Sequence, residues 1–232
     1  MTAPGFPGFP EPRGVCHVSV SILVFIHPSS VRYDACCADR ERAPIMAEGN
    51  SQRSNTLLMT RRRRQLIYLL GFMGVGKSTV GALLARKLRW PFIDLDATIE
   101  AGQGTTIRQM FEQAGETFFR EIERAALIEA SKAEPAIIAL GGGTFVQPLN
   151  FEYIQETGGA TVWLDCSLEE LRRRCEGKDD RPLFRDPASF AQLLEQRLPY
   201  YRRADHRVST EGRDPEEVAE QILRLSLGHL GG

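Results

Sequence analysis

One segment of nine residues constrains this chain more than any other. Residues 71–79 read Gly-Phe-Met-Gly-Val-Gly-Lys-Ser-Thr and match the pattern G-x-x-x-x-G-K-[ST] in full. An apolar run at residues 65–70 precedes the segment and is typical of a buried strand, and residues 76–88 place apolar side chains on one face of a helix. Because a strand, a glycine-rich turn and a helix are the context that this pattern requires, we predict a phosphate-binding loop.

The residue types in this loop suit the triphosphate tail of a nucleotide. Glycines let backbone N–H groups curl around phosphate oxygens, and the helix that follows adds partial positive charge at its N-terminus. Lys77 can reach the β- and γ-phosphates, and the Ser78 hydroxyl can ligate Mg²⁺. Phosphate binding alone does not separate a small-molecule kinase from a GTPase or a motor ATPase, so the rest of the chain must decide.

Strands and helices alternate through the remainder of the sequence. This alternation favours an α/β fold whose mainly parallel sheet is covered by helices on both faces. Ligands of such sheets bind at the carboxyl ends of the strands, so residues that directly follow strands are the first site candidates. Further strands are predicted at residues 92–93, 136–140, 160–164 and 206–209, and further helices at residues 106–110, 116–132, 167–175, 187–201 and 215–227.

Two carboxylates follow the second predicted strand. Asp94 and Asp96 are two residues apart, and in extended chain both side chains point to the same side, toward the phosphate pocket. One carboxylate can hold Mg²⁺ through water, and the other can accept a proton from the hydroxyl of an acceptor molecule. The alternative is that one of them, Asp96 in particular, caps a helix beginning near Ala97, because Asp is a preferred N-cap residue.

Three consecutive glycines, Gly141, Gly142 and Gly143, follow the third predicted strand. The lack of side chains allows a small ligand to approach the backbone closely. A simple turn is the alternative, but a turn alone does not need three glycines, so we favour the ligand-binding interpretation.

Arginines stand at positions that suit an anionic substrate. Arg120 lies near the start of a predicted helix, and Glu123, three residues later, can hold its guanidinium in one rotamer for a carboxylate. Arg181 lies in the polar stretch 176–186, a candidate mobile lid, where a cation can stabilise a phosphoryl group in transfer. Arg197 lies in the next helix. A surface ion pair is the common alternative for any single arginine, but the combination favours a site.

Taken in order, these residues resemble the shikimate kinase family. The resemblance extends from about residue 65 to residue 225. It implies a P-loop fold like that of nucleoside monophosphate kinases, with a five-stranded parallel sheet, helices on both faces and a mobile lid. It also implies transfer of a phosphoryl group from ATP to the 3-hydroxyl of shikimate, in chorismate and aromatic amino-acid biosynthesis. The motifs that carry it are the phosphate loop, Asp94-Leu-Asp96, Phe119-Arg120 with Glu123, Gly141-Gly-Gly143, Arg181-Pro-Leu183 and Arg197 ahead of Pro199-Tyr200-Tyr201-Arg202-Arg203.

On the nucleotide side, the resemblance implies that ATP lies in the phosphate loop and that Lys77 and Arg181 act catalytically on its phosphates. Ser78 and Asp94 would hold Mg²⁺, the second implied cofactor. Arg174 and Arg213 would lie against the adenine, an assignment that rests more on position than on a motif. The residues that would bind the nucleotide are Gly74, Val75, Gly76, Lys77, Ser78, Thr79, Arg174, Arg181 and Arg213.

On the substrate side, the resemblance implies that Asp96 binds the hydroxyls of shikimate and acts as the catalytic base. Arg120 and Arg197 would bind the shikimate carboxylate, with Glu123 orienting Arg120. The glycines that would complete the substrate site are Gly141, Gly142 and Gly143.

Two alternatives remain open. One is another small-molecule kinase on the same scaffold, acting on gluconate or on a nucleoside monophosphate. The other is a ligand-sensing regulator, in which a module of this family is joined to a DNA-binding segment. Residues 1–64 contain no convincing pair of amphipathic helices for a helix-turn-helix, which weighs against the regulator.

Composition argues against other classes of partner. The 29 Lys and Arg residues against 30 Asp and Glu give a net charge of −1, which offers no argument for nucleic acid or a membrane. The five cysteines, an odd count without repeated spacing, indicate free thiols. No apolar run reaches the roughly 20 residues that span a bilayer, and residues 15–26 lack the flanks of a signal peptide. We expect a monomer in the cytoplasm.

Residues 1–64 differ in composition from the rest. Residues 1–12 contain four prolines, and residues 46–60 are polar and weakly patterned, as in poorly ordered segments. We expect this extension to be disordered or to reflect a mis-assigned start codon, with residues 65–228 forming the kinase domain. The four arginines at residues 61–64 suit either contact with nucleic acid or an acidic surface, or a solvated lead-in to the first strand, and we favour the lead-in.

Overall fold

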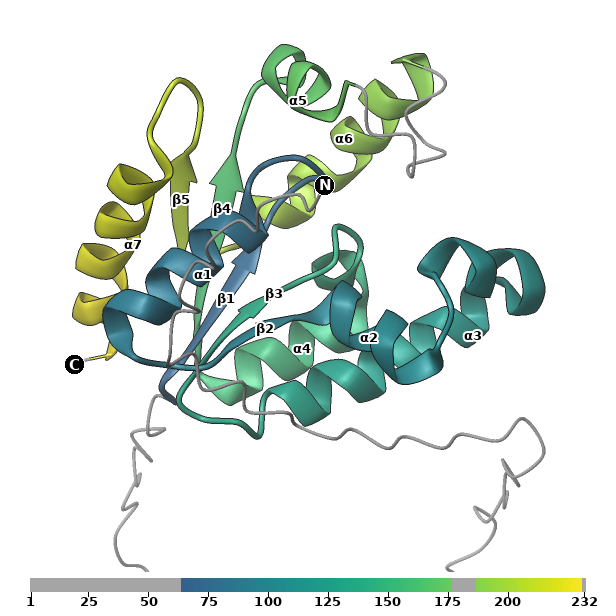
Figure 1. Ribbon diagram of the computed structural model, residues 1–232, viewed down its shortest axis with the longest axis horizontal. Helices are drawn as coiled ribbons and strands as arrows, with labels where there is room; N and C mark the ends of the chain where they lie inside the picture. The colour runs from purple at the N-terminus through teal and green to yellow at the C-terminus, as the bar shows by residue number, and fades with distance from the viewer. Residues whose placement is uncertain (1–63, 177–186, 231–232) are drawn as a thin grey trace, which may run out of the picture.

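The computed structural model describes residues 64–176 and 187–230. Within these ranges, five strands form one sheet in the order β2-β3-β1-β4-β5, and every neighbouring pair runs parallel (Figure 1). The predicted α/β fold with a five-stranded parallel sheet is therefore confirmed. The strands are β1 (Leu66–Leu70), β2 (Phe92–Asp94), β3 (Ala136–Ala139), β4 (Ala160–Asp165) and β5 (His206–Ser209).

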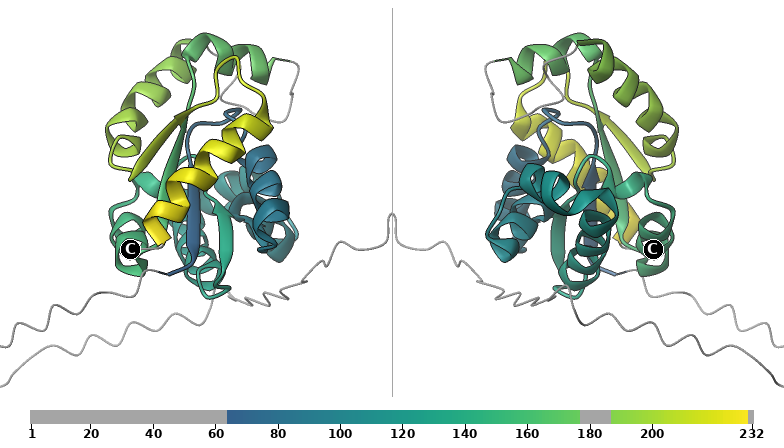
Figure 2. Two further views of the ribbon diagram at one scale, coloured as in Figure 1. Left: turned by 90° about the vertical axis from the view of Figure 1, so that its left-hand side faces the viewer. Right: turned by 90° about the vertical axis from the view of Figure 1, so that its right-hand side faces the viewer.

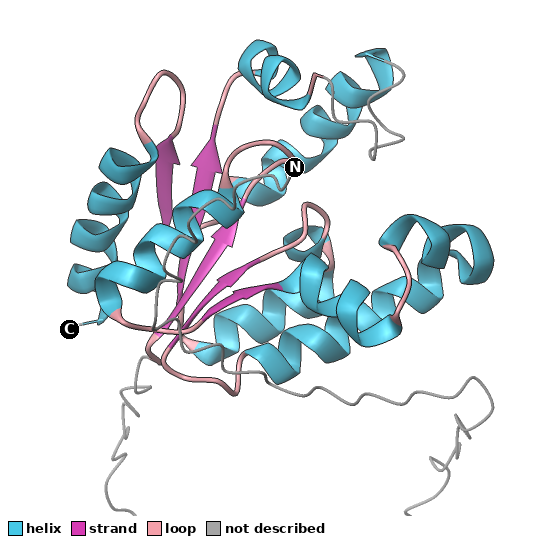
Figure 3. Cartoon of the chain, in the orientation of Figure 1, coloured by secondary structure: helices cyan, strands magenta, loops and turns pink. Residues whose placement is uncertain are grey.

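Helices cover both faces of this sheet (Figures 2 and 3). Helices α1 and α7 pack on each other over one face. On the other face α3 and α4 meet, where the Tyr68 hydroxyl is hydrogen-bonded to Ser131 at 2.9 Å and to Thr157 at 3.2 Å. The helices are α1 (Lys77–Leu88), α2 (Leu95–Gln103), α3 (Ile107–Ala130), α4 (Pro148–Thr157), α5 (Leu168–Cys175), α6 (Pro187–Tyr201) and α7 (Pro215–Leu230), with a 3₁₀ turn at Thr144–Val146.

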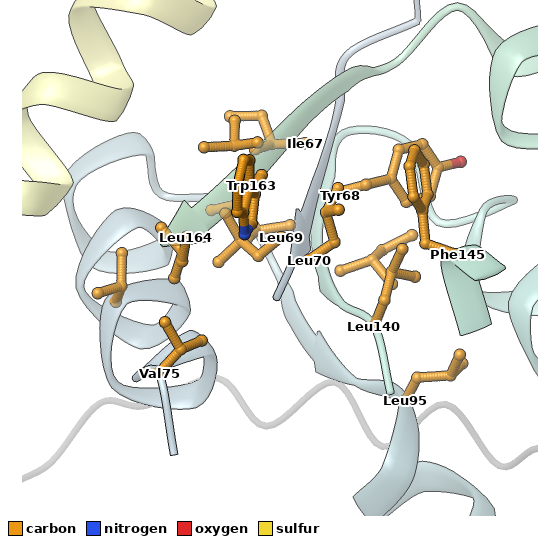
Figure 4. Packing of buried hydrophobic residues seen from close by; sticks show 14 of the residues in the cluster. Ile67, Tyr68, Leu69, Leu70, Val75, Leu95, Leu140, Phe145, Trp163 and Leu164 are labelled. Carbon is orange, nitrogen blue, oxygen red and sulfur yellow. The ribbon is translucent and has the colours of Figure 1, made fainter. Parts of the chain in front are cut away.

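The core is centred on β1, whose side chains are all at most 1% exposed. Burial on both faces is expected of a central strand in a parallel sheet with two helical layers. Figure 4 shows Tyr68 beside Phe145, with Val75 and Leu164 grouped apart from them. This packing fixes the end of β1 from which the glycine-rich loop departs.

Local structure differs from the sequence predictions in three segments. Helix α2 begins directly after Asp94, so Asp96 lies in its first turn and not in extended chain. The two helices predicted around residues 106–132 are joined into α3 at a kink, where Gly115 has φ 79° and ψ 176°. Helix α4 is absent from the predictions, because only Asn150, Ile154 and Thr157 of its residues are buried and its apolar stripe is weak.

Several sequence predictions lie outside the described residues. These are the extension up to residue 63, the lid segment 177–186 and Arg181 within it. Arg64, the last of the four arginines, is described: its Nε lies 3.6 Å from Glu134, and its Nη1 donates to the Ser131 carbonyl at 3.4 Å. Among the described helices, none has both the length and the apolar character needed to cross a membrane.

Candidate active site

The predicted phosphate loop joins β1 to α1 through backbone conformations that favour glycine. Gly74 and Gly76 have φ values of 79° and 102°, in the left-handed region where other side chains are strained. Gly76 is also the N-cap of α1 and supplies no capping side chain. The first N–H groups of α1 are therefore not satisfied by a side-chain cap, and these are the donors that a phosphate binds at a helix N-terminus.

The side chain of Lys77 folds back over this loop. Its ammonium donates to the carbonyl oxygens of Gly71 at 3.0 Å and Phe72 at 3.1 Å. These bonds hold one positive charge at the mouth of the loop, beside the N-terminus of α1. An anion with several oxygens fits this combination of a cation and oriented N–H donors.

The two residues predicted to hold Mg²⁺ contact each other. The Ser78 hydroxyl donates to Asp94 Oδ2 at 2.6 Å, and Asp94 Oδ1 accepts from the Ala97 N–H at 3.3 Å as the N-cap of α2. The helix cap is thus Asp94, not Asp96 as the alternative interpretation supposed. A hydroxyl and a carboxylate are hard oxygen ligands of the kind that Mg²⁺ uses beside nucleotide phosphates, so the residues fit this ion.

Asp96 lies on the other side of the same helix turn and faces the glycines that follow β3. A Cβ built on Gly141 would lie 2.5 Å from Asp96 Oδ1, so glycine is needed for the carboxylate to fit there. Burial raises the pKa of Asp96 to about 6, with the charge of Lys77 opposing this rise and the charges of Asp94 and Glu123 adding to it. The carboxylate is therefore mostly ionised at neutral pH and still able to take up a proton.

Arg120 is held from two sides on α3. Its Nη1 donates to Glu123 Oε2 at 2.9 Å, while its Nε and Nη2 donate to Glu116 Oε1 at 3.2 and 3.0 Å. Glu123 is only 1% exposed, and its second oxygen accepts from the Thr144 hydroxyl at 2.7 Å. The Arg120 guanidinium also lies 5.3 Å from the Phe119 ring. These contacts hold the guanidinium in place on a side chain that is 22% exposed.

The three glycines after β3 bring the predicted substrate residues together. Asp96 lies against Gly141, as described above. A Cβ on Gly142 would lie 2.8 Å from Arg197 Nη1, and a Cβ on Gly143 would lie 3.0 Å from both Nη atoms of Arg120. One carboxylate and two guanidinium groups from α2, α3 and α6 thus converge on a single turn. This arrangement suits a small ligand that carries both a carboxylate and hydroxyls.

The two arginines predicted beside adenine lie in different surroundings. Arg174 of α5 donates to the Val75 carbonyl of the phosphate loop at 3.4 Å and to the Thr210 carbonyl after β5 at 2.8 Å. Arg213 donates to the Ser209 carbonyl at 3.3 Å and is bound to Gln221. Arg174 is therefore joined to the loop directly, whereas Arg213 contacts the last residue of β5 and a residue within α7.

Sequence reasoning gave no role to four residues that contact this site. Glu116 binds Arg120, Thr144 binds Glu123, and Tyr201 binds the Gly142 carbonyl at 2.5 Å. Cys175 packs under the loop, where a Cβ on Gly74 would lie 2.5 Å from its Sγ. Two of them carry a helical signal, since Glu116 precedes Arg120 by four residues and Tyr201 follows Arg197 by four. The other two meet their partners only through the tertiary fold.

The matching family profile and the curated relatives point to one family. The family profile described as shikimate kinase matches residues 73–226. A shikimate kinase of Persephonella marina is 40% identical over 158 residues, which cover 68% of this chain and 96% of the relative. One from Aquifex aeolicus is 41% identical over 170 residues, covering 72% of this chain and 99% of the relative. The solved structure of shikimate kinase from Acinetobacter baumannii in complex with shikimate superposes with a TM-score of 0.67 at 35% identity, covering 70% of this chain and 93% of that one.

Proposed function

The chain belongs to the shikimate kinase family, and from this premise we propose how its residues share the transfer of a phosphoryl group from ATP to the 3-hydroxyl of shikimate. The transfer needs little covalent chemistry from the protein. It needs the two reactants held in line, with cations where negative charge develops. The two halves of the site, the phosphate loop and the turn at residues 141–143, supply these functions separately.

The phosphate loop binds the nucleotide. Backbone N–H groups of the loop and of the start of α1 hold the phosphates of ATP, and Lys77 exchanges its bonds to the loop carbonyls for bonds to the β- and γ-phosphates. Ser78 and Asp94 would hold Mg²⁺, Asp94 through water. When bound, this ion would neutralise negative charge on the phosphates of the nucleotide. Arg181 adds a further cation near the phosphates, and Arg174 and Arg213 lie toward the adenine.

The turn at residues 141–143 and its three charged neighbours bind shikimate. Arg120 and Arg197 take the carboxylate of the substrate, and Glu123 keeps Arg120 in place. Asp96 accepts hydrogen bonds from the ring hydroxyls. Shikimate is a compact acid with several alcohols, and two cations beside one carboxylate are the complement of that chemistry.

Asp96 acts as the base. Its pKa of about 6 keeps the carboxylate ionised at neutral pH. The same pKa is close enough to the working pH for the carboxylate to accept the proton of the 3-hydroxyl. The 3-oxygen then forms a bond to the γ-phosphorus while the bond from that phosphorus to the β,γ-bridging oxygen breaks. ADP leaves, and Lys77 stabilises the charge that builds on the leaving side.

We further propose that residues 65–228 act as one domain and as a monomer in the cytoplasm. Light scattering of the active protein tests this proposal: the mass of a single chain supports it, and a stable dimer contradicts it.

The observation that carries the proposal is the convergence of Asp96, Arg120 and Arg197 on one turn beside the phosphate loop. A coupled assay of ADP release across a panel of acceptors tests it. We expect turnover with shikimate and only background rates with gluconate and nucleoside monophosphates. Turnover of gluconate or a nucleoside monophosphate with none of shikimate would overturn the assignment, and DNA binding without any ADP release would favour the sensing regulator.

A further inference from the structure

Tyr201, the last residue of α6, is a buried polar side chain that the mechanism above does not use. It is 1% exposed, and its hydroxyl donates to the Gly142 carbonyl at 2.5 Å. The Arg197 guanidinium lies beside the same glycine and acts to lower the pKa of the phenol through its charge and hydrogen bonding. A phenol oxygen has one proton to give and lone pairs to receive, so it can donate to the carbonyl and accept from the guanidinium at once.

The position of Tyr201 follows from the helix. It lies four residues after Arg197, so both side chains leave α6 on the same face, one turn apart. Gly142 lies next to both side chains. A Cβ built on Gly142 would lie 2.8 Å from Arg197 Nη1 and 3.8 Å from the Tyr201 hydroxyl. The hydroxyl, the guanidinium and the glycine backbone therefore form one contact group.

The surroundings keep this phenol fixed and protonated. Its ring packs beside the Trp163 ring of β4, with 6.2 Å between centroids. Burial raises the pKa of Tyr201 to about 12, against the opposing effect of Arg197, so the O–H remains a donor at any pH where the enzyme works. Tyr201 is thus a permanent link between a helix and the turn that follows β3.

We propose that Tyr201 is a positioning residue for the substrate carboxylate, because its hydroxyl ties the Arg197 guanidinium to the backbone of Gly142. The inference rests on the proposed function, in which Arg197 binds that carboxylate. Without the hydroxyl, Arg197 keeps its charge and its stacking over the Phe72 ring at 5.5 Å, but loses the bond that sets its angle. The link itself runs through Tyr201, Arg197 and Gly142, and the phosphate loop meets it only where Phe72 packs on Arg197.

The test replaces Tyr201 by Phe and compares it with Tyr200→Phe, a matched control at a neighbouring position that is 37% exposed. We expect Tyr201→Phe to raise KM for shikimate by about 10- to 100-fold, the range for a buried hydrogen bond whose partner is left unsatisfied. KM for ATP should change by less than about twofold, and Tyr200→Phe should match the wild type in both. This split between two substrates is a result that a general loss of folding would not give.

The same substitution made in an Arg197→Ala variant separates the hydrogen-bonded link from a packing effect of the Tyr201 ring. In Arg197→Ala the guanidinium is gone, so adding Tyr201→Phe should raise KM for shikimate much less than it does in the wild type. The proposal would be overturned if Tyr201→Phe had equal effects in both backgrounds, or if folded Tyr201→Phe left KM for shikimate unchanged. It would also be overturned if KM for ATP and KM for shikimate rose equally. A wild type that does not phosphorylate shikimate would instead overturn the proposed function.

A measurement on the wild type covers the case in which Tyr201→Phe does not fold. With ¹³C at the tyrosine ζ-carbons, the Tyr201 resonance should shift when shikimate is added to the protein carrying ADP and Mg²⁺. The Tyr200 resonance serves as the internal reference. A Tyr201 resonance that stays in place under saturating shikimate would contradict a link between this hydroxyl and the bound carboxylate.

Discussion

The two halves of the site are built in opposite ways. The phosphate half is one contiguous loop of residues 71–79, shaped by backbone conformation and closed by bonds from Lys77 to its own carbonyls. The acid half consists of Asp96, Arg120, Arg197 and the turn at residues 141–143, which come from α2, α3, α6 and the segment after β3. It is held by side-chain bonds that join residues 21 and 59 positions apart. Changes in the phosphate half should therefore stop the reaction, whereas changes in the acid half should act selectively and by degrees.

Lys77→Ala is expected to have the largest effect. It removes the positive charge nearest the phosphates, where negative charge develops, and turnover should fall by roughly 10³-fold or more. Lys87→Ala is the matched control, because this lysine of the same helix only pairs with Glu216 and Glu220 on the surface. If Lys77→Ala kept more than a tenth of wild-type kcat, the phosphate half would not have the role we give it.

Asp96→Asn tests the residue where the two halves meet. The amide keeps the shape of the carboxylate but cannot take a proton, so kcat should fall by roughly 10²- to 10⁴-fold while the protein stays folded. The measurement is steady-state kinetics with both substrates saturating. Wild-type turnover would remove Asp96 from the role of base and leave it as a hydrogen-bond acceptor only.

Arg120→Ala should affect the acid half alone. Loss of this cation leaves the buried Glu123 without its partner, and we expect shikimate binding to weaken by about 2–5 kcal/mol with ATP affinity unchanged. Arg108→Ala is the control, since Arg108 lies on the same helix and forms an exposed pair with Glu112 at 2.8 Å. Equal damage to the affinity for ATP would show that the two halves are not separable.

The raised pKa of Asp96 also predicts a cost in stability. Between the unfolded pKa of 3.8 and the folded pKa of about 6, the folded state binds the proton more tightly, so stability falls as pH rises through this window. Asp96→Asn should therefore be more stable than the wild type by about 1–3 kcal/mol at pH 8. Urea unfolding at pH 8 and pH 4 measures this gap. A gap that is equal at both pH values would contradict the titration.

Glu116→Gln should have the smallest effect. Glu116 is exposed and shares the Nε and Nη2 of Arg120 that a substrate carboxylate needs. Because it competes for these donors, neutralising it should lower KM for shikimate by about two- to fivefold, the scale of an exposed ion pair. Steady-state kinetics checks this prediction, and a tenfold rise in KM would mean that Glu116 positions Arg120 instead of competing for it.

The contrast between the halves also explains what could be predicted from sequence. The loop and Lys77 follow from a contiguous pattern, and the parallel sheet from alternating strands and helices, because both depend on local spacing. The extended interpretation of residues 94–96 was wrong because the Asp94 side chain caps α2, and capping competes with strand extension in a way that spacing does not reveal. The contacts of Thr144 with Glu123 and of Gly143 with Arg120 join segments about 20 residues apart, which only the fold brings together.

Calorimetric titration of shikimate into the wild-type protein, saturated with ADP and Mg²⁺, tests the central claim most directly. A preassembled acid half beside a filled phosphate half predicts saturable heat at one shikimate per chain, and Arg120→Ala should lose most of that heat under the same conditions. Clear binding of ADP followed by no heat from shikimate would contradict the account.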